Sequence, residues 1–377
     1  MTIFPAVQDT AGCFAAPGDG MLRFIGVGDL ALENGGTLPS VTLAFETWGT
    51  LNADASNAVL IQHALTGSSH VARGASSEDG WWEDLVGPGK TIDTDRYFVV
   101  AANVIGGCYG STGPSSYAPD GKVWGSRFPS VTVRDSVNVE ARLADSLGIT
   151  RWHAVAGGSL GGARALEWAA TYPERLAHCL VVAATAASTA EHIAFAQTQI
   201  AAIRMDQHFN NGDYYGGPHP LQGLGLARRI AHITYRSEAE LQRRFGRQTQ
   251  PGEPPEIRDR PQDRGRYRVE SYLDHHADKL AARFDANSYV VLTELLMSHD
   301  VGRNRGTVQQ AFAGSATSFV IAPVDSDRLY FPQQSYDLAA ALPGPVEVCT
   351  IRTPEGHDGF LTSISQLDAV LRRSIFG

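Results

Sequence analysis

A serine between glycines is the first residue of the chain whose surroundings suggest chemistry. Residues 157–161 read Gly-Gly-Ser-Leu-Gly, which matches the pattern G-x-S-x-G. An apolar run at 152–156 predicts a strand before the motif, and the spacing of 160–170, ended by Pro173, predicts a helix after it. So tight a turn leaves no room for side chains beside the serine, which explains the glycines. We predict that Ser159 is a nucleophile; the alternative is an ordinary serine in a glycine-rich turn.

A histidine near the end of the chain is the candidate base for this serine. Enzymes of the α/β-hydrolase fold carry their triad in the order Ser, acid, His. Of the 12 histidines, only His357 follows the apolar run 346–351. For the acid, the apolar run 318–322 leads into a loop with Asp325 and Asp327, and spacing does not choose between them. A carboxylate is needed because it orients the histidine and stabilises the imidazolium formed when the serine loses its proton.

Two backbone N–H groups are needed to stabilise the oxyanion formed at an attacked carbonyl. Leu160, the residue after the serine, supplies one. The second comes from the loop after the apolar run 58–63, from Ala64 or Leu65, and we favour Leu65. A further glycine-rich stretch, 106–113, lacks the lysine of a phosphate-binding P-loop, so we interpret it as a structural or substrate-lining loop.

The elements that position these residues alternate between strand and helix. Short apolar runs predict strands at 41–47, 58–63, 97–104, 152–156, 179–184, 318–322 and 346–351. Between them lie helical patterns such as 133–147, which Gly148 closes. Near-continuous apolar strands that alternate with helices predict an α/β fold with a mostly parallel central sheet. Its functional site should lie at the carboxyl ends of the strands.

The alternation stops between residues 188 and 306, where we find no convincing strand. Helical patterns occupy 189–205, 221–235, 238–245 and 286–296. We therefore predict an α/β-hydrolase fold whose core is built from residues 1–187 and 307–377. Residues 188–306 are predicted to form a helical lid insertion over the mouth of the nucleophile.

The composition argues against several other classes of protein. The chain has 377 residues and a net charge of −9, which disfavours nucleic acid or an anionic membrane surface as the main partner. Its longest apolar run, 179–187, is too short to cross a membrane. The 4 cysteines are widely spread and show no metal-ligand spacing, so we expect neither a disulfide framework nor a metal site. The first residues lack the pattern of a secretion signal, and we expect a cytoplasmic protein.

Several longer stretches of the chain together resemble the homoserine O-acetyltransferases of methionine biosynthesis. They are FETWGTLN (45–52), SNAVLIQHALTG (56–67), NVIGGCYGSTGP (103–114), FPSVTVRD (128–135), GGSLGGARALEWA (157–169), GLARRIAHITYRS (225–237), SDRLYFP (326–332) and GHDGFL (356–361). The resemblance covers most of the predicted core and part of the predicted lid. It implies that Asp327 is the catalytic acid and that Arg228, Tyr235 and Asp358 bind the amino-acid acceptor. One departure is Leu160, where many relatives have Met, and it leaves the backbone N–H intact.

The chemistry of the acceptor agrees with these residue types. Homoserine carries a carboxylate, which suits a guanidinium group, and an ammonium, which suits a carboxylate. Arg228 and Tyr235 are seven residues apart, so a helix brings both to one face after two turns. The adjacent Arg229 is an alternative to Arg228. A structural salt bridge or a surface position is the alternative role for each acceptor residue.

The resemblance implies an acyltransferase that moves the acetyl group of acetyl-CoA to the γ-hydroxyl of L-homoserine. We expect a ping-pong mechanism through an acyl-Ser159 intermediate, with acetyl-CoA as co-substrate and no cofactor or metal. The family also implies a homodimer, without nucleic-acid or membrane partners. The open alternatives are a succinyl donor, a serine acceptor, or an esterase on the same fold. A catalytically dead hydrolase used as a binding module is disfavoured, because nucleophile, acid, base and oxyanion loop are all present.

Overall fold

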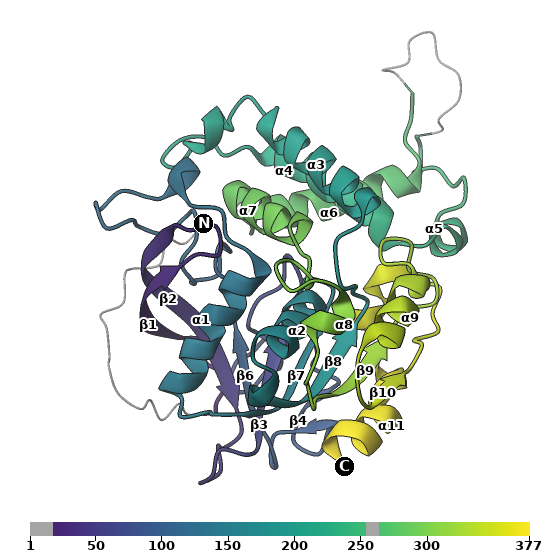
Figure 1. The fold of residues 1–377 in the computed structure, drawn as a ribbon. Coiled ribbons are helices and arrows are strands. Elements are labelled where there is room, and N and C mark those ends of the chain that lie inside the picture. The colour runs from purple at the N-terminus through teal and green to yellow at the C-terminus, as the bar shows by residue number, and fades with distance from the viewer. Residues whose placement is uncertain (1–17, 254–263) are drawn as a thin grey trace.

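The computed structural model describes residues 18–253 and 264–377, which form a central sheet between helices, with a further helical layer above it (Figure 1). The expectation that the chain has no secretion signal concerns residues 1–17 and lies outside the described residues.

The central sheet has 8 strands in the order β1-β2-β6-β3-β7-β8-β9-β10. Their bounds are β1 Arg23–Ala31, β2 Thr37–Trp48, β3 Ala58–Gln62, β6 Phe98–Ala102, β7 Trp152–Gly158, β8 Leu176–Val182, β9 Ser318–Ala322 and β10 Val346–Val348. Strands β1 and β2 form an antiparallel hairpin, β2 is antiparallel to β6, and every neighbouring pair from β6 to β10 is parallel. The prediction of a mostly parallel sheet is therefore confirmed. Two short strands, β4 Val86–Gly87 and β5 Ile92–Asp93, pair separately.

Helices follow most of the parallel strands. Their bounds are α1 Val133–Ser146, α2 Leu160–Thr171, α3 Ala190–Arg204, α4 Leu221–Tyr235, α5 Glu238–Arg244, α6 Arg268–Ala281, α7 Ala286–Met297, α8 Val308–Ala311, α9 Pro332–Ala341, α10 Gly359–Thr362 and α11 Asp368–Leu371. Thr132 caps α1 by accepting a hydrogen bond from the Asp135 N–H, and the Asp135 side chain accepts one from Thr132 in return. The helix ends before Gly148, whose φ of +74° is the left-handed conformation that glycine adopts easily.

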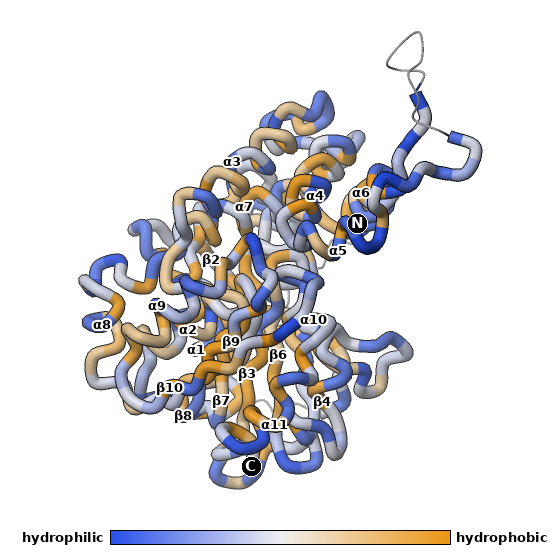
Figure 2. Tube along the Cα trace, turned by 90° about the vertical axis from the view of Figure 1, so that its right-hand side faces the viewer, coloured by the Kyte–Doolittle hydropathy of each residue, from blue (hydrophilic) through white to orange (hydrophobic). Residues whose placement is uncertain are grey.

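Both faces of the sheet are covered because its central strands are apolar on both sides. Every residue of β3 and β6 is buried, and the strands in the centre of the molecule are predominantly hydrophobic (Figure 2). One face packs against α1, α2 and α9. The other packs against the segment around Trp82 and the C-terminal helices, through Leu367, Leu371 and Phe376. Such two-sided burial is what a parallel sheet requires.

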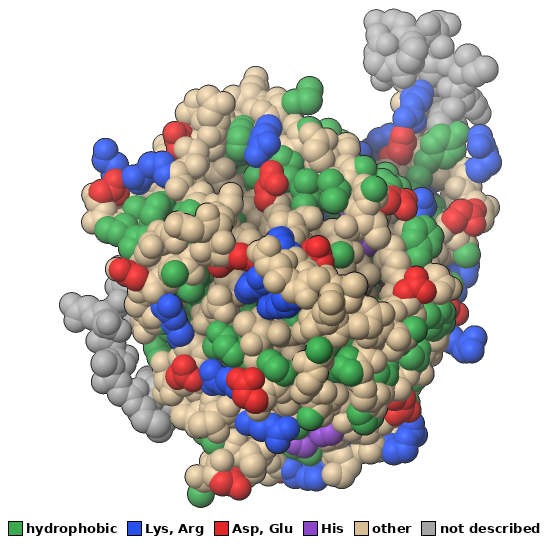
Figure 3. All heavy atoms as spheres, in the orientation of Figure 1, with side chains coloured by type: hydrophobic (Ala, Val, Ile, Leu, Met, Phe, Trp, Pro, Cys, Tyr) green, Lys and Arg blue, Asp and Glu red, His purple; other side chains and the backbone are tan. Residues whose placement is uncertain are grey.

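Helices α3 to α7 form a layer above the sheet (Figure 1). The chain leaves the core and returns to it at one place, because Ala187 and Asp300 form an antiparallel bridge and Val301 N–H donates to the Ala186 carbonyl at 2.9 Å. Hydrophobic side chains lie at the surface of this layer, among charged residues of both signs (Figure 3). The exposed apolar residues of this layer include Leu221, Leu226 and Ile233 of α4, whose side chains are 52%, 49% and 44% exposed.

Strand β1 and helix α6 are among the longest of the elements that were not predicted from the sequence. Strand β1 has glycines at positions 26 and 28 and an edge position with half-exposed side chains, so its apolar signal is weak. Helix α6 is largely polar, and only Ala277 and Leu280 are buried. Its apolar residues Val269, Leu273, Ala277 and Leu280 nevertheless recur at helical spacing, so the sequence does carry a helical signal here that the prediction missed.

Candidate active site

The turn that carries Ser159 joins the carboxyl end of β7 to the first residue of α2. Ser159 has φ +57° and ψ −123°, a strained conformation for a residue with a side chain. The glycines around it are required by close packing. A Cβ on Gly157 would lie 2.4 Å from the Gly161 backbone, and one on Gly161 would lie 2.0 Å from the Gln62 carbonyl oxygen. This tight turn, the nucleophile elbow, therefore packs against the end of β3 and directs the Ser159 hydroxyl out of the sheet.

His357 links this serine to an acid. Its Nε2 lies 2.9 Å from Ser159 Oγ, and its Nδ1 lies 2.7 Å from Asp327 Oδ2. All three side chains are buried. Asp327 Oδ1 accepts the N–H groups of Leu329 and Tyr330 at 2.8 and 2.9 Å, which leaves Oδ2 for the histidine.

The other candidate acid has a different role. Asp325 Oδ1 accepts the Thr353 N–H at 2.9 Å, and no imidazole of the described residues bonds to this carboxylate. The structure therefore brings Asp327 to His357 and keeps Asp325 in a structural contact. The distinction follows from the backbone turn after β9, which spacing in the sequence does not reveal.

The environment of His357 favours its protonated form. Burial alone would lower the pKa of this imidazole, but the charge of Asp327 and the hydrogen bond to it outweigh burial, so the pKa lies above its ordinary value. Two tyrosines pack against the ring: Tyr330 is stacked on it at 5.2 Å between centroids, and Tyr235 lies at 5.6 Å. A base in this setting can hold the proton of the serine during attack on a carbonyl.

The loop after β3 and the start of α2 carry free backbone donors. Among the described residues, the N–H groups of Ala64, Leu65 and Leu160 donate to no acceptor. The loop is held by His63, whose Nδ1 donates to the Ala64 carbonyl at 2.7 Å and whose Nε2 accepts the Val104 N–H at 3.1 Å. Unpaired N–H groups beside a nucleophile are the donors that an oxyanion hole needs. The geometry leaves both Ala64 and Leu65 available for the second position.

Charged residues of α4 lie next to the triad. The Arg228 guanidinium carbon is 5.6 Å from the centre of the Tyr235 ring, so the two residues do share a helix face. Arg228 Nε is buried without a hydrogen-bond partner among the described residues, and no described carboxylate forms an ion pair with this side chain. The adjacent Arg229 instead pairs with Asp274 of α6. Arg228 is thus the one of the two that is available to an anionic ligand.

Asp358 has a partner that sequence reasoning missed. Its Oδ2 lies 3.0 Å from an Arg236 nitrogen, and Arg236 also contacts Glu240. Burial raises the pKa of Asp358, and the Arg236 charge opposes that rise. The missed signal is the position of Arg236 immediately after α4, eight residues beyond Arg228, where the chain turns toward the histidine loop. This turn is close-packed, because a Cβ on Gly356 would lie 2.6 Å from the Tyr235 carbonyl oxygen.

A histidine of α4 completes this environment. Burial, reinforced by Arg228, lowers the pKa of His232 to about 2. Its Nδ1 lies 3.2 Å from the Tyr272 hydroxyl of α6, and its ring stacks on His276 at 3.9 Å. His232 is therefore neutral at physiological pH and adds no positive charge beside Arg228.

Neither a metal cluster nor a membrane helix occurs in the part of the chain that the structure describes. Within residues 18–253 and 264–377, no group of three or more His, Cys, Asp or Glu side chains is arranged to hold a metal ion. No described helix is both long and apolar enough to span a bilayer.

Comparisons with known proteins identify relatives over most of the chain. Residues 57–363 match the family model of the alpha/beta hydrolase fold. The sequence is 56% identical to the homoserine O-acetyltransferase of Thermobifida fusca, over 91% of this chain and 90% of that protein. The structure is similar to the homoserine O-acetyltransferase of Bacillus anthracis, with a TM-score of 0.87 and 27% identity over 94% of this chain and 97% of the other. It is equally similar to esterase E22, with a TM-score of 0.86 and 28% identity over 94% of this chain and 99% of the other.

Proposed function

Because this chain belongs to the homoserine O-acetyltransferase family within the α/β-hydrolase fold, we propose that it transfers the acetyl group of acetyl-CoA to the γ-hydroxyl of L-homoserine. The products are O-acetyl-L-homoserine and CoA, and the reaction belongs to methionine biosynthesis. The observation that carries this proposal is the hydrogen-bonded chain from Ser159 through His357 to Asp327, with an unpaired Arg228 beside it.

The first half of the reaction acylates the serine. Ser159 Oγ attacks the thioester carbonyl while His357 Nε2 takes the hydroxyl proton, and Asp327 stabilises the imidazolium. The N–H groups of Leu160 and Leu65 hold the oxyanion. The C–S bond then breaks, His357 returns the proton to the sulfur, and CoA leaves an acetyl ester on Ser159.

The second half transfers the acetyl group to the amino acid. The γ-hydroxyl of homoserine gives its proton to His357 and attacks the ester carbonyl. The bond to Ser159 Oγ breaks, and His357 returns the proton to that oxygen. This is a ping-pong mechanism, and its charges are carried by the triad and the backbone N–H groups, so it needs neither metal nor cofactor.

The acceptor is recognised by its charges. Arg228 binds the carboxylate of homoserine, and its buried Nε without a partner supports this role. Asp358 binds the ammonium, with Arg236 holding the carboxylate of Asp358 in place at 3.0 Å. Tyr235 packs between Arg228 and His357, so it positions the acceptor against the base. Helices α3 to α7 exclude water, which favours transfer to the alcohol over hydrolysis.

We also propose that the protein is a homodimer and that it is cytoplasmic. Its partners are its small-molecule substrates, not nucleic acid or membranes. The exposed apolar residues Leu221, Leu226 and Ile233 lie on one helix and support pairing of two copies through α4.

Release of thiol from acetyl-CoA by the purified protein tests the reaction. The assay is run with L-homoserine, with L-serine and without acceptor, and is repeated with succinyl-CoA. Rapid turnover only with acetyl-CoA and homoserine is expected. Equally fast turnover without acceptor would mean that water, and not homoserine, attacks the acetyl ester in the second half of the reaction.

An esterase is the second candidate function, because the structure matches esterase E22 as closely as it matches a transferase. The two functions differ in the fate of the acetyl group. Cleavage of p-nitrophenyl acetate in the presence of homoserine separates them: both functions release p-nitrophenol, but a transferase yields O-acetylhomoserine and an esterase yields acetate. The ratio of these products is measured by mass spectrometry.

A further inference from the structure

Arg236 lies between two carboxylates, of which only one belongs to the proposed acceptor site. Its Nη2 is 3.0 Å from Asp358 Oδ2, and its Nη1 is 3.3 Å from Glu240 Oε1. Asp358 directly follows the catalytic His357, whereas Glu240 lies in α5, four residues after Arg236. One guanidinium is therefore shared by two anions that come from different parts of the chain.

Burial makes the contacts of this arginine strong. The side chains of Arg236, Asp358 and Glu240 are 14%, 15% and 3% exposed, so water screens their charges poorly. Burial alone would lower the pKa of Arg236, but Asp358, Tyr272 and Glu240 outweigh burial, so this pKa lies above its ordinary value. Arg236 consequently stays charged, and its position decides which of the two carboxylates it neutralises.

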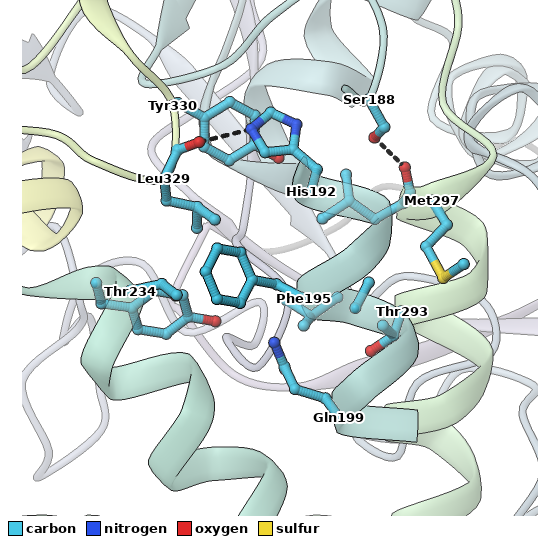
Figure 4. A pocket seen from close by; sticks show the side chains of 13 residues that line it. Ser188, His192, Phe195, Gln199, Thr234, Thr293, Met297, Leu329 and Tyr330 are labelled. Carbon is cyan, nitrogen blue, oxygen red and sulfur yellow. Dashed lines mark hydrogen bonds between the residues drawn. The ribbon is translucent and has the colours of Figure 1, made fainter. Parts of the chain in front are cut away.

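The ammonium of the acceptor has to compete with Arg236 for Asp358. Two cations on one poorly hydrated carboxylate repel each other, and the charge of Arg228 also acts on Asp358. The small pocket that Tyr235 lines offers the ammonium no opposite charge, because none of the residues around it is Asp, Glu, Lys or Arg (Figure 4). Binding of the ammonium at Asp358 is therefore favoured when Arg236 moves away.

Glu240 has the free oxygen that can receive the displaced arginine. Its Oε1 accepts hydrogen bonds from Arg236 and Arg244 at 3.3 and 3.0 Å. Its Oε2 is buried and has no hydrogen-bond partner among the described residues, which is costly for a carboxylate. If Nη2 of Arg236 turns from Asp358 to this oxygen while Nη1 stays on Oε1, the two side chains form a bidentate pair. Bidentate pairing is a strong arrangement of these two groups.

We infer that Glu240 is a positioning residue for the acceptor: it draws Arg236 away from Asp358 when the ammonium of homoserine binds there. The inference rests on the proposed function, in which Asp358 binds that ammonium. The carboxylate of homoserine is then paired with Arg228 and its ammonium with Asp358. Arg236 is paired with Glu240, so every charge at the site has an opposite partner. Arg236 thus holds Asp358 in place until the ammonium arrives and then releases it.

Two acceptors that differ only in the ammonium test this role. L-homoserine carries it, and 4-hydroxybutyrate has the same chain, carboxylate and terminal hydroxyl without it. The kcat/KM of each acceptor is measured with acetyl-CoA, from thiol release and from mass spectrometry of the acetyl ester. The ratio of the two values does not depend on the first half of the reaction, because both acceptors attack the same acyl-Ser159.

Three variants are compared with the wild type by this ratio. Glu240→Gln removes the charge while nearly keeping the shape of the side chain. Glu238→Gln removes a charge from an exposed position of the same helix and is the matched control. Arg236→Gln removes the competing cation, so a double variant with Glu240→Gln tests whether Glu240 acts through Arg236.

Glu240→Gln should lower the ratio of homoserine to 4-hydroxybutyrate by about 10-fold, because Arg236 stays on Asp358 and opposes the ammonium. The loss should appear as a higher KM for homoserine, and Glu238→Gln should leave the ratio unchanged. In the Arg236→Gln background, the same replacement of Glu240 should change the ratio by less than about 2-fold.

A merely structural role of Glu240 would weaken both acceptors alike and leave their ratio unchanged. That result, or an equal fall of the ratio with and without Arg236, would overturn the inference while the proposed function stands. A wild type that acetylates no homoserine would instead overturn the proposed function.

Discussion

The Nε2 atom of His357 lies 2.9 Å from Ser159 Oγ, although 198 positions separate the two residues in the chain. The serine is held by the elbow between β7 and α2, and the histidine by the short turn after β10. Strands β7 and β10 belong to the same sheet, which fixes both ends of the contact. The nucleophile and its base are therefore assembled before any substrate binds.

Replacing the nucleophile should stop the first half of the reaction. We expect Ser159→Ala to lower thiol release from acetyl-CoA by about 10⁴-fold or more, since both acyl transfers use this oxygen. The variant should fold normally, which circular dichroism checks. Substantial turnover by the folded variant would rule out the acyl-serine route.

The raised pKa of His357 predicts the acid side of the pH profile. The base must be neutral to accept a proton, so kcat/KM should fall as pH decreases through a pKa above the ordinary value of 6.5. In Asp327→Asn the charge is lost and burial dominates, so this limb should move to lower pH while kcat falls by about 10³- to 10⁴-fold. An acid limb at the same pH in both proteins would contradict this account.

Arg228 and Asp358 should affect the acceptor and not the donor. Arg228→Ala and Asp358→Asn should each raise the KM for homoserine by about 10- to 100-fold, because each removes a hydrogen bond between charged groups. The burst of thiol from acetyl-CoA without acceptor should keep its rate, which stopped-flow detection measures. Arg229→Ala is the matched control, since Arg229 pairs with Asp274. A slower burst in the Arg228 variant would place this residue on the donor side.

Stability should depend strongly on one ion pair beneath the elbow. Arg164 of α2 and Glu140 of α1 are paired and 0% and 2% exposed, and Glu140 Oε2 also accepts Gln62 and Trp168 at 2.7 Å. Glu140→Ala leaves the Arg164 charge buried without its partner, so the free energy of unfolding should fall by about 3–5 kcal/mol. Asp120→Ala breaks the exposed pair with Arg127 and should cost at most about 1 kcal/mol. Urea unfolding measures the free energy of unfolding of both variants, and losses of similar size in the two would contradict this prediction.

The oligomeric state should depend on the apolar residues of α4. Light scattering after size-exclusion chromatography is expected to give a dimer for the wild type. A charge at the 49%-exposed Leu226, as in Leu226→Glu, should shift the mass toward the monomer. Val348→Glu, at an exposed position of β10, is the control and should leave the mass unchanged.

The parts of the site that were predictable are those set by short-range sequence. The elbow at Ser159 and the late position of His357 follow from motif and chain order, and the strands around them are strongly apolar. The choice of Asp327 over Asp325 came only from family resemblance, because the turn after β9 decides it. The contact between Arg236 and Asp358 depends on how α4 meets the histidine loop, and such tertiary packing leaves no periodic signal.

Strand β1 shows the same limit at the level of the fold, whereas helix α6 does not. Strand β1 is stabilised by pairing with β2, which its glycine-containing sequence does not indicate. Helix α6 is stabilised by ion pairs and rings on α4, such as Asp274 with Arg229 and Tyr272 with His232. Its apolar residues also recur at helical spacing, so this helix was missed although its pattern is present in the sequence.

The bridge between Ala187 and Asp300 has an evolutionary consequence. Since the chain leaves and re-enters the core at adjacent points, a short turn would be enough to connect the two core segments in place of the whole helical layer. The entropy of closing a loop grows only slowly with its length, so long and short insertions are tolerated almost equally by the core. Gene segments that encode this layer can therefore be lengthened, shortened or exchanged while the elbow stays intact. One inherited acylating centre can in this way serve new acceptors, with water as the simplest of them.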